Sequence, residues 1–578
     1  MAVNLFEQHR PREATITVSQ GDPTQNQDYS GDFVCDGVAD DVELNAAITY
    51  IGALGSGEIM VLQGTYDMTA AHTVIDNLSI VGLGKNKTIF NVTANINLFA
   101  CTVGANPSFV TFVDFSVILT NAPGDQVGVV RAFYLLSGTD LNFTNILVED
   151  GWTTVAPVPV GTSASFWIGN YASEFGIVER VWMLNCEADG RGVRDFGGLG
   201  VFGWLTGFVC NCRFKVRDSD VAIDAGLPAS VGIHRAKTVH FSNCIIEYGH
   251  HNGVWFADNS AAGFYSEDIA FVVCTFRNNG DDAIDPNYDF DISIIGCNFV
   301  DNEFELVSFE DGCERCRVIG CKTDDRRVIV SASSRIVISG NHFIRAERGA
   351  CGVQVLSSSS IVTITGNEFR NCSNAIRIDT STLVTITGNI MDAVNYQDSC
   401  LIIDDSTYVS VIGNIILGPT STAIHAIEEQ GTSDYNVISW NIFWTADGND
   451  FYTVFVGANT IVENNTGDRM RDADGSMTGA AGTFYTYDRQ SGQITGISTA
   501  AVARVAGAET YHTRFPLGIT PRLTATLVDV NAAVTIDTVQ VDTVTNIGFN
   551  WSINVTTLFA DSECKLDWKA RPTHRMYD

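Results

Sequence analysis

Five aspartates lie within eleven consecutive positions of the segment RNNGDDAIDPNYDFD, which begins at Arg277, and they are the residues best suited to chemistry. Crowded carboxylates repel one another, so some of their pKa values rise and one group can act as a general acid near neutral pH. Two carboxyl groups flanking a sugar linkage are the catalytic apparatus of most enzymes that hydrolyse glycosides. The catalytic residues that we predict are Asp224, Asp281, Asp282 and Asp285.

Asp224 and Asp285 end two similar segments, VAID and AID, which lie two units apart in a sequence repeat. If these segments are stacked strands, the two carboxylates are about 10 Å apart, near the upper limit for an inverting pair. Two alternatives stay open. Asp, Asn and Gly are also the ordinary residues of tight turns. The side-chain oxygens that alternate from Asp285 to Asp291 could bind Ca²⁺, although their spacing is not that of an EF-hand. Apart from this possible Ca²⁺ site, we expect no metal and no cofactor.

Aromatic and basic side chains gather in the segments 156–176 and 188–204, where the repeat unit is longest. Aromatic rings offer flat faces on which the CH groups of sugars stack, and nearby polar groups can hydrogen-bond sugar oxygens. The alternative is that these rings pack loops onto the body of the protein or against a neighbouring subunit. The glycan-binding residues that we predict are Trp167, Tyr171, Arg191, Arg194, Trp204 and Trp255.

A phrase of alternating apolar residues, a small residue, and then Asn or Cys recurs through most of the chain, as in VTITGNEF at 362–369. From Cys274 onward its period is 20 to 27 residues, which is too short for a helical crossover and is typical of a β-solenoid. We expect successive strands to stack about 4.8 Å apart. The Asn and Cys anchors then form buried ladders rather than disulfides or metal sites. The anchors are Cys186, Cys212, Cys244, Cys274, Cys297, Cys321, Asn341, Asn367, Asn389, Asn414, Asn441 and Asn465.

A second apolar segment follows each anchor by eight to twelve residues, for example GVWF at 253–256 and AIRI at 375–378. Two or three strands per coil predict an all-β protein built on a right-handed parallel β-helix. The stretch DGVADDVELNAAITYIGALGSGEIMVLQGTYDM at 36–68 resembles the first segment of pectate-lyase-like β-helix proteins. Apolar residues at helical spacing after Asp40 and Asp41 predict a helix over 39–51 that caps the open end of the solenoid.

The ladder pattern stops near residue 468, and the chain then changes character. Residues 469–508 are rich in Gly, Ser and Asp and are predicted to be a linker. Strict alternation over 511–572, broken every eight to ten residues, predicts a small antiparallel β-sandwich at 509–578. Its pattern, with TNIGF at 545–549 and Trp568 near the end, resembles the H-type lectin-like domains of some viral tail fibres.

The net charge is -33, from 67 acidic and 34 basic residues. Such a field repels phosphates, which argues against nucleic acid and anionic membranes as partners. A dense acidic surface is also suited to high salt, so a halophilic host is one interpretation, with simple solubility as the other. No run of eighteen apolar residues predicts a membrane span, and the first residues do not resemble a signal peptide, so we expect synthesis in a host cytoplasm.

Together these features resemble the tailspike or tail-fibre proteins of tailed viruses. That resemblance implies a parallel homotrimer in the virion tail, attached through residues 1–30 to other tail proteins, with residues 31–468 as the β-helix. It implies binding of a host cell-surface glycan and leaves cleavage open, with hydrolysis favoured over lysis. The alternatives are an adhesin without enzymatic activity and a free-standing polysaccharide lyase or hydrolase.

Overall fold

The computed structural model shows a solenoid of parallel β-strands followed by separate antiparallel strands, and the chain divides into two compact units at residues 363 and 364. The described residues are 14–21, 31–37, 39–101, 104–120, 130–150, 165–170, 177–190, 196–216, 229–256, 265–323, 326–344, 351–372, 374–392, 399–417, 425–444, 452–454, 456–457, 459–463, 465–467, 490–498, 504–510, 522–529, 536–544, 548–555 and 563–571. Within them, no helix is both long and apolar enough to span a membrane.

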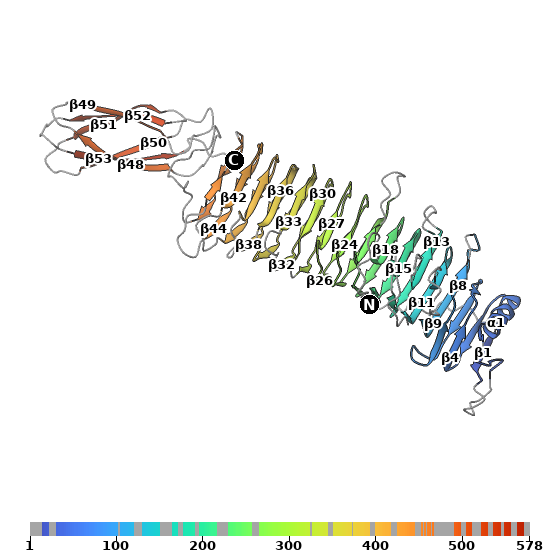
Figure 1. Ribbon diagram of the computed structural model, residues 1–578. Helices are drawn as coiled ribbons and strands as arrows, with labels where there is room; N and C mark the ends of the chain where they lie inside the picture. Colours follow the sequence, from blue (N-terminus) through green and yellow to red (C-terminus); the bar gives the residue numbers. More distant parts are fainter. Residues whose placement is uncertain are drawn as a thin grey trace. The chain divides into compact units, whose positions relative to one another are not determined.

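The first unit begins with a helix, α1 (Asp41–Leu54), packed against the strands β1 (Thr15–Gln20) and β3 (Gly57–Val61) (Figure 1). The helix is three residues longer than predicted at its C-terminus and buries Leu44, Ala47, Ile48 and Ile51. The carboxylate of Asp40 accepts hydrogen bonds from the backbone N–H groups of Gly37 and Asp67, both at 2.9 Å. Asp41 accepts a hydrogen bond from the backbone N–H of Thr69 at 3.1 Å, so both aspartates of the sequence motif tie the start of the helix to the first coil.

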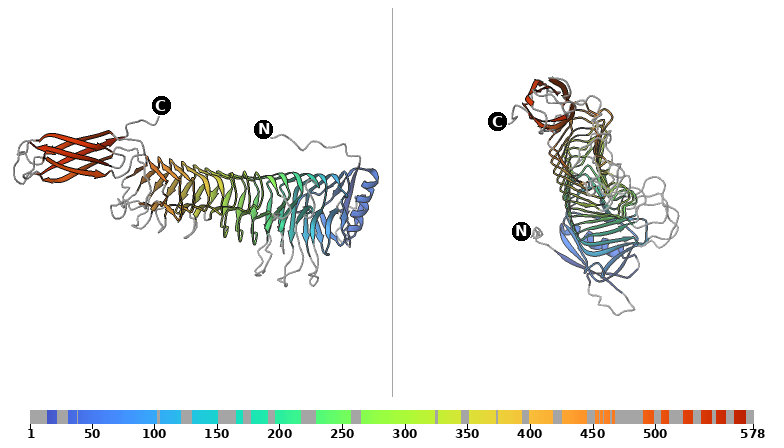
Figure 2. Two further views of the ribbon diagram at one scale, coloured as in Figure 1. Left: turned by 90° about the horizontal axis from the view of Figure 1, so that it is seen from above. Right: turned by 90° about the vertical axis from the view of Figure 1, so that its left-hand side faces the viewer.

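Most coils contribute one strand to a sheet that we call sheet B and two strands to a longer sheet, sheet A, and all pairings in these two sheets are parallel (Figure 2). In two coils a single long strand, β9 (Ser108–Leu119) or β11 (Thr139–Asp150), takes both places in sheet A. In the first unit the sheet B strands are β5 (His72–Thr73), β8 (Asn97–Cys101), β10 (Arg131–Leu135), β12 (Phe166–Gly169), β15 (Phe196–Phe202), β18 (Ala229–His234), β21 (Val254–Phe256), β24 (Ile284–Asp285), β27 (Val307–Phe309), β30 (Val328–Ser331) and β33 (Cys351–Leu356). In the second unit they are β36 (Asn374–Asp379), β39 (Leu401–Asp404), β42 (His425–Gln430) and β45 (Tyr452–Val454).

The predicted ladders are confirmed. The side-chain oxygen of Asn389 accepts hydrogen bonds from the backbone N–H and the amide of Asn367, at 2.9 and 3.0 Å, and Asn414, Asn441 and Asn465 repeat this pattern. The six anchor cysteines are buried, and every cysteine whose surroundings the structure describes is a free thiol. The buried thiols donate to backbone carbonyls, so they act as small core residues, as expected.

The chain ends in two three-stranded antiparallel sheets. One contains β48 (Gln490–Ser498), β53 (Glu563–Arg571) and β50 (Arg522–Asp529), and the other contains β49 (Arg504–Thr510), β52 (Gly548–Val555) and β51 (Ile536–Val544). Their packing into a sandwich stays a prediction. The predicted linker was too long, because β48 lies inside 469–508: its glycine-interrupted sequence QSGQITGIS conceals the alternation of a strand.

Candidate functional site

Asp281 and Asp282 lie on the turn that leads into β24, Asp285 is the last residue of β24, and Asp289 and Asp291 follow that strand, all in the first unit. The turn packs tightly against the equivalent turn of the preceding coil. A β-carbon added at Gly249 would lie 2.1 Å from the carbonyl oxygen of Asn252, and one at Gly280 would lie 2.3 Å from that of His250. Only glycine fits at these two positions, so the GHHNG and NNGDD motifs are explained first by close backbone packing.

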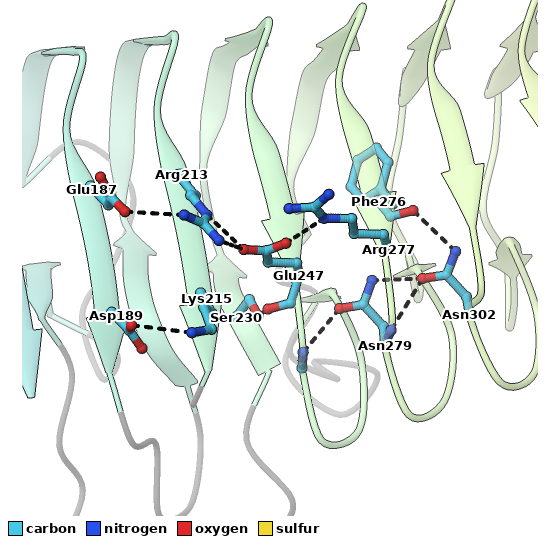
Figure 3. Close-up of polar contacts among 11 residues, drawn as sticks. Glu187, Asp189, Arg213, Lys215, Ser230, Glu247, Phe276, Arg277, Asn279 and Asn302 are labelled. Carbon is cyan, nitrogen blue, oxygen red and sulfur yellow. Dashed lines mark hydrogen bonds and ion pairs between the residues drawn. The ribbon is translucent and has the colours of Figure 1, made fainter. Parts of the chain in front are cut away.

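A second ladder of amides holds this turn in place. The side-chain oxygen of Asn279 accepts a hydrogen bond from the N–H of Gly249 at 3.0 Å, and its amide donates to the side-chain oxygen of Asn302 at 2.8 Å (Figure 3). The amide of Asn302 in turn donates to the carbonyl of Phe276 at 3.2 Å. Because both asparagines are buried and bonded, the residues that follow them, at 281–285 and 303–305, are positioned by rigid structure.

An ion-pair ladder runs beside this turn on the second strands of sheet A, β17 (Arg213–Val216), β20 (Ile245–Glu247) and β23 (Thr275–Arg277) (Figure 3). The carboxylate of Glu247 is fully buried, accepts a hydrogen bond from the Arg213 guanidinium at 2.6 Å and also contacts Arg277. Its backbone carbonyl accepts a hydrogen bond from Ser230 of β18 at 2.8 Å. This ladder therefore links sheet A to the sheet that carries the aspartates.

Asn252 connects two of the predicted catalytic aspartates. Its side chain is fully buried, its amide donates to a carboxylate oxygen of Asp285 at 2.9 Å, and its oxygen accepts the backbone N–H of Asp282 at 3.3 Å. Asn252 is not among the residues predicted from the sequence, because Asn in a turn between glycines is ordinary turn chemistry. Its burial beside a carboxyl group is visible only in three dimensions.

Asp281, Asp282 and Glu305 form a compact cluster, in which one carboxylate oxygen from each lies within 4.8 Å of the others. His251 contacts Asp281 at 2.9 Å, and Arg327 contacts Glu305 at 2.6 Å. Glu305 and Arg327 belong to the site although neither was predicted to be functional. Three such oxygens could hold a hard cation, but they are not the ones predicted for Ca²⁺: among the described residues the set from Asp285 to Asp291 forms no such cluster, because Asp289 accepts backbone N–H groups and Asp291 pairs with Arg315.

Burial and mutual repulsion change the protonation of the cluster. Burial, and then the charges of Asp285 and Glu305, raises the pKa of Asp282 to about 10. Burial, and then the charge of Glu310, raises the pKa of Asp285 to about 7, while the hydrogen bond from Asn252 opposes the rise. The hydrogen bond to Asp281 raises the pKa of His251. At neutral pH the site therefore holds one protonated carboxyl group and a second that titrates.

An aromatic row leads along sheet B to Asp285. Strand pairing places Tyr134 next to Trp167, then Gly200, Gly232 and Trp255, and Trp255 next to Asp285. Both tryptophans are partly exposed and pack against the buried ring of Phe202, which lies 5.0 Å from that of Trp167. The guanidinium of Arg131 lies 4.0 Å from the centre of the Trp167 ring. From Tyr134 to Trp255 the row is roughly four strand spacings long, or about 19 Å, and we call Tyr134, Trp167 and Trp255 the aromatic floor.

Two of the sequence predictions are wrong. Trp204 is fully buried and donates its indole N–H to the carbonyl of Ile168 at 2.8 Å, so it is a core residue without a face for a sugar. The alignment of Asp224 with Asp285 also fails, because the sheet B strand of that coil is β18, and Gly232 is the residue two coils before Asp285 in register. Asp224, Tyr171, Arg191 and Arg194 lie outside the described residues.

Comparison with known proteins agrees with this architecture. Residues 229–416 match the family described as "Right handed beta helix region", so the fold is a right-handed parallel β-helix, as predicted. No curated protein matches the sequence.

Three solved structures illustrate the likeness. The tailspike protein of Pseudomonas phage LKA1 is 10% identical with a TM-score of 0.37, over 91% of this chain and 92% of that one. A tailspike mutant of E. coli bacteriophage HK620, in complex with a pentasaccharide, is 11% identical with a TM-score of 0.48, over 92% and 90%. The A-module of an Azotobacter vinelandii mannuronan C-5 epimerase is 14% identical with a TM-score of 0.34, over 75% and 97%.

Proposed function

We propose that the protein binds a polysaccharide along the outer face of sheet B and cleaves it at the aspartate cluster. One observation carries this proposal: Trp255, a partly exposed aromatic platform, is the direct strand neighbour of Asp285, whose pKa is raised to about 7. An aromatic face next to a carboxyl group that holds its proton near neutral pH suits a sugar ring and its linkage oxygen. Elsewhere on the face, Trp167 and Tyr134 would support neighbouring sugar units.

The proposed reaction is hydrolysis with Asp285 as general acid. The protonated carboxyl group of Asp285 donates its proton to the glycosidic oxygen as the bond from that oxygen to the anomeric carbon breaks. Water attacks the anomeric carbon and gives a proton to Asp281, which His251 orients. Asp282, protonated at neutral pH, acts as a hydrogen-bond donor to the sugar, and Asn252 positions Asp285.

The biological setting belongs to the proposal as well. A tailspike or tail fibre would be a homotrimer in the virion tail, made in the host cytoplasm and bound to other tail proteins, and the polysaccharide would be a host surface glycan. The sequence resemblance supports this setting. The competing function is an adhesin that uses the aromatic floor without cleavage, and the free-standing polysaccharide-degrading enzyme stays the third candidate.

The test is incubation of the protein with a panel of purified bacterial capsular polysaccharides. Chain length is followed by size-exclusion chromatography and new reducing ends are counted. We expect shortening by the wild type and its loss in Asp285→Asn. The matched control is Asp291→Asn, which removes a carboxylate of the same segment that is paired with Arg315 at 2.7 Å instead.

Binding without shortening would refute the enzymatic part and leave the adhesin. If Asp291→Asn lost activity as completely as Asp285→Asn, the site would be wrongly placed. Retention of the polysaccharide by the Trp255→Ala variant with unchanged affinity would refute the aromatic floor as the binding surface.

A further inference from the structure

The outer surface of the last coils in the second unit carries a row of exposed isoleucines. The strands β38 (Ile390–Asp392), β41 (Ile415–Leu417) and β44 (Ile442–Trp444) each begin with isoleucine, and parallel pairing aligns Ile390 with Ile415 and Ile415 with Ile442. These side chains are 40, 36 and 48% exposed. Because residues in register on parallel strands lie about 4.8 Å apart, the three form a continuous apolar ridge.

Two tyrosines form a second row on the same coils. Tyr408 and Tyr435 lie two residues before β40 (Ser410–Ile412) and β43 (Val437–Ser439), and the centres of their rings are 5.4 Å apart with 15° between the planes. They are 54 and 50% exposed. The strands β40 and β43, which lie in the sequence between the tyrosine and isoleucine rows, contain no charged residue.

Trp440 occupies a backbone position that glycine holds in the preceding coils. Its φ is 58°, whereas Gly366, Gly388 and Gly413 take the corresponding place with φ of 63, 63 and 65°. Many other non-glycine residues of the described part of the chain have positive φ, Val273 among them, so this backbone conformation does not by itself mark a function. What distinguishes Trp440 is its large indole, which is 58% exposed and lies two residues before Ile442 in the sequence.

We infer that this surface, formed by Ile390, Tyr408, Ile415, Tyr435, Trp440 and Ile442, is where the protein binds a second copy of itself. The proposed function includes a homotrimer, and this inference names the surface through which its copies bind one another. Only the number of copies is taken from the proposed function. The glycan-binding and cleavage steps are independent of it.

The size of the surface is adequate for a stable contact. Aromatic side chains bury about 150–250 Å² each when fully covered, so six large side chains at half exposure offer roughly 600 Å². A standard interface buries about 800 Å² on each partner, which neighbouring residues would complete. Exposed apolar patches above a few hundred Å² mark interaction sites on soluble proteins.

The periodicity of the surface favours a copy of the same chain over another partner. A net charge of -33 on each copy opposes self-association, so the contact would have to centre on uncharged strands such as β40 and β43. The ridge is also periodic, with one isoleucine per coil. A second solenoid presents the same period, so ridges from two copies can interdigitate coil by coil, which an unrelated globular surface cannot match.

The test is the mass of the full-length protein by sedimentation velocity over a concentration series. We expect the wild type to sediment as a multiple of 62.6 kDa. Trp440→Gly should raise the dissociation constant at least about tenfold, because a central tryptophan is a typical hot spot. This variant restores the unstrained residue at φ of 58°, so its melting temperature, measured under dissociating conditions, should not fall.

The matched control is Val273→Gly. Val273 takes the same turn position in its own coil, with φ of 55° and 58% exposure, but lies outside the proposed surface. It should leave the mass unchanged. A second variant, Ile415→Ser with Ile442→Ser, tests the ridge itself and should also weaken association.

A wild-type protein that stays monomeric at every concentration would overturn the inference. The same result is expected if the C-terminal strands of the chain itself cover the surface. An oligomer that survives both Trp440→Gly and the double isoleucine variant would place the contact elsewhere and overturn it too. Self-association without any polysaccharide binding would refute the proposed function and leave this inference standing.

Discussion

Replacing Asp285 by Asn should stabilise the fold while it abolishes cleavage. The pKa of this carboxyl group is raised from 3.8 to about 7, so ionisation is disfavoured in the folded state. A raised pKa means that the folded protein binds a proton more tightly than the unfolded chain between those two values. Stability therefore falls as pH rises from about 4 to about 7 and stays reduced above that. Asparagine keeps the shape, and its side-chain oxygen can still accept the hydrogen bond from Asn252.

The size of the effect follows from the two pKa values. With 1.36 kcal/mol per pKa unit, the ionisation penalty on the free energy of unfolding is about 1.7 kcal/mol at pH 5 and about 4 kcal/mol at pH 8. The stability advantage of Asp285→Asn over the wild type should thus widen by roughly 2–3 kcal/mol between these pH values. Because Asp285 is partly exposed, these figures are upper limits.

Urea unfolding of both proteins at pH 5 and pH 8 measures this difference directly. Burial also disfavours ionisation of Asp282 and Asp289, but this cost is present in both proteins and largely cancels in the stability difference between them. Loss of the Asp285 charge additionally makes ionisation of Asp282 easier in the variant. A stability difference that does not change with pH, or a variant less stable than the wild type at pH 8, would contradict the reasoning.

Three further substitutions test other parts of the structure. Glu247→Gln should lower the free energy of unfolding by about 3 kcal/mol in urea melts, at the low end for a broken buried pair because its arginine partners are partly exposed. Asn414→Ala should cost about 2–3 kcal/mol in the same assay, since it leaves buried backbone groups of the ladder unsatisfied. Trp204→Phe should cost about 1–3 kcal/mol, by freeing the Ile168 carbonyl, and leave polysaccharide affinity intact, whereas Trp255→Ala should lower that affinity; equal effects on affinity would contradict the assignment.

The fold was predictable because its determinants are local and repeated. An inward Asn or Cys in every coil, such as Asn389 or Cys274, is a signal that sequence alone carries. The early coils are longer and lack that regularity. The sheet B strand of one such coil was therefore predicted at 221–224, whereas the structure has it at β18 (Ala229–His234). Trp204 was misjudged because a tryptophan in a glycine-rich run has no alternating neighbours to indicate which way it points.

The candidate site was predictable only in part. Asp285 is the last residue of β24 and pairs with Trp255, so its place at the end of a sheet B strand could be predicted from the sequence, whereas its catalytic role stays a prediction. Asn252, Glu305 and Arg327 reach the site from other coils, so their roles depend on contacts between residues more than twenty positions apart. A period in the sequence predicts which coils are adjacent, but not which turn side chains meet.

Gly200 and Gly232 separate Trp167 from Trp255 along sheet B, and this spacing has a consequence for ligands of different length. Trp167 and Trp255 are three strand spacings apart, or about 14 Å, on a rigid sheet. If the polysaccharide binds along this face as proposed, a short oligosaccharide would stack on one platform only, whereas a longer chain would reach both, and its second contact would form intramolecularly at a high effective concentration. Affinity should therefore rise steeply once the ligand exceeds that span, so that the scaffold itself works as a molecular ruler.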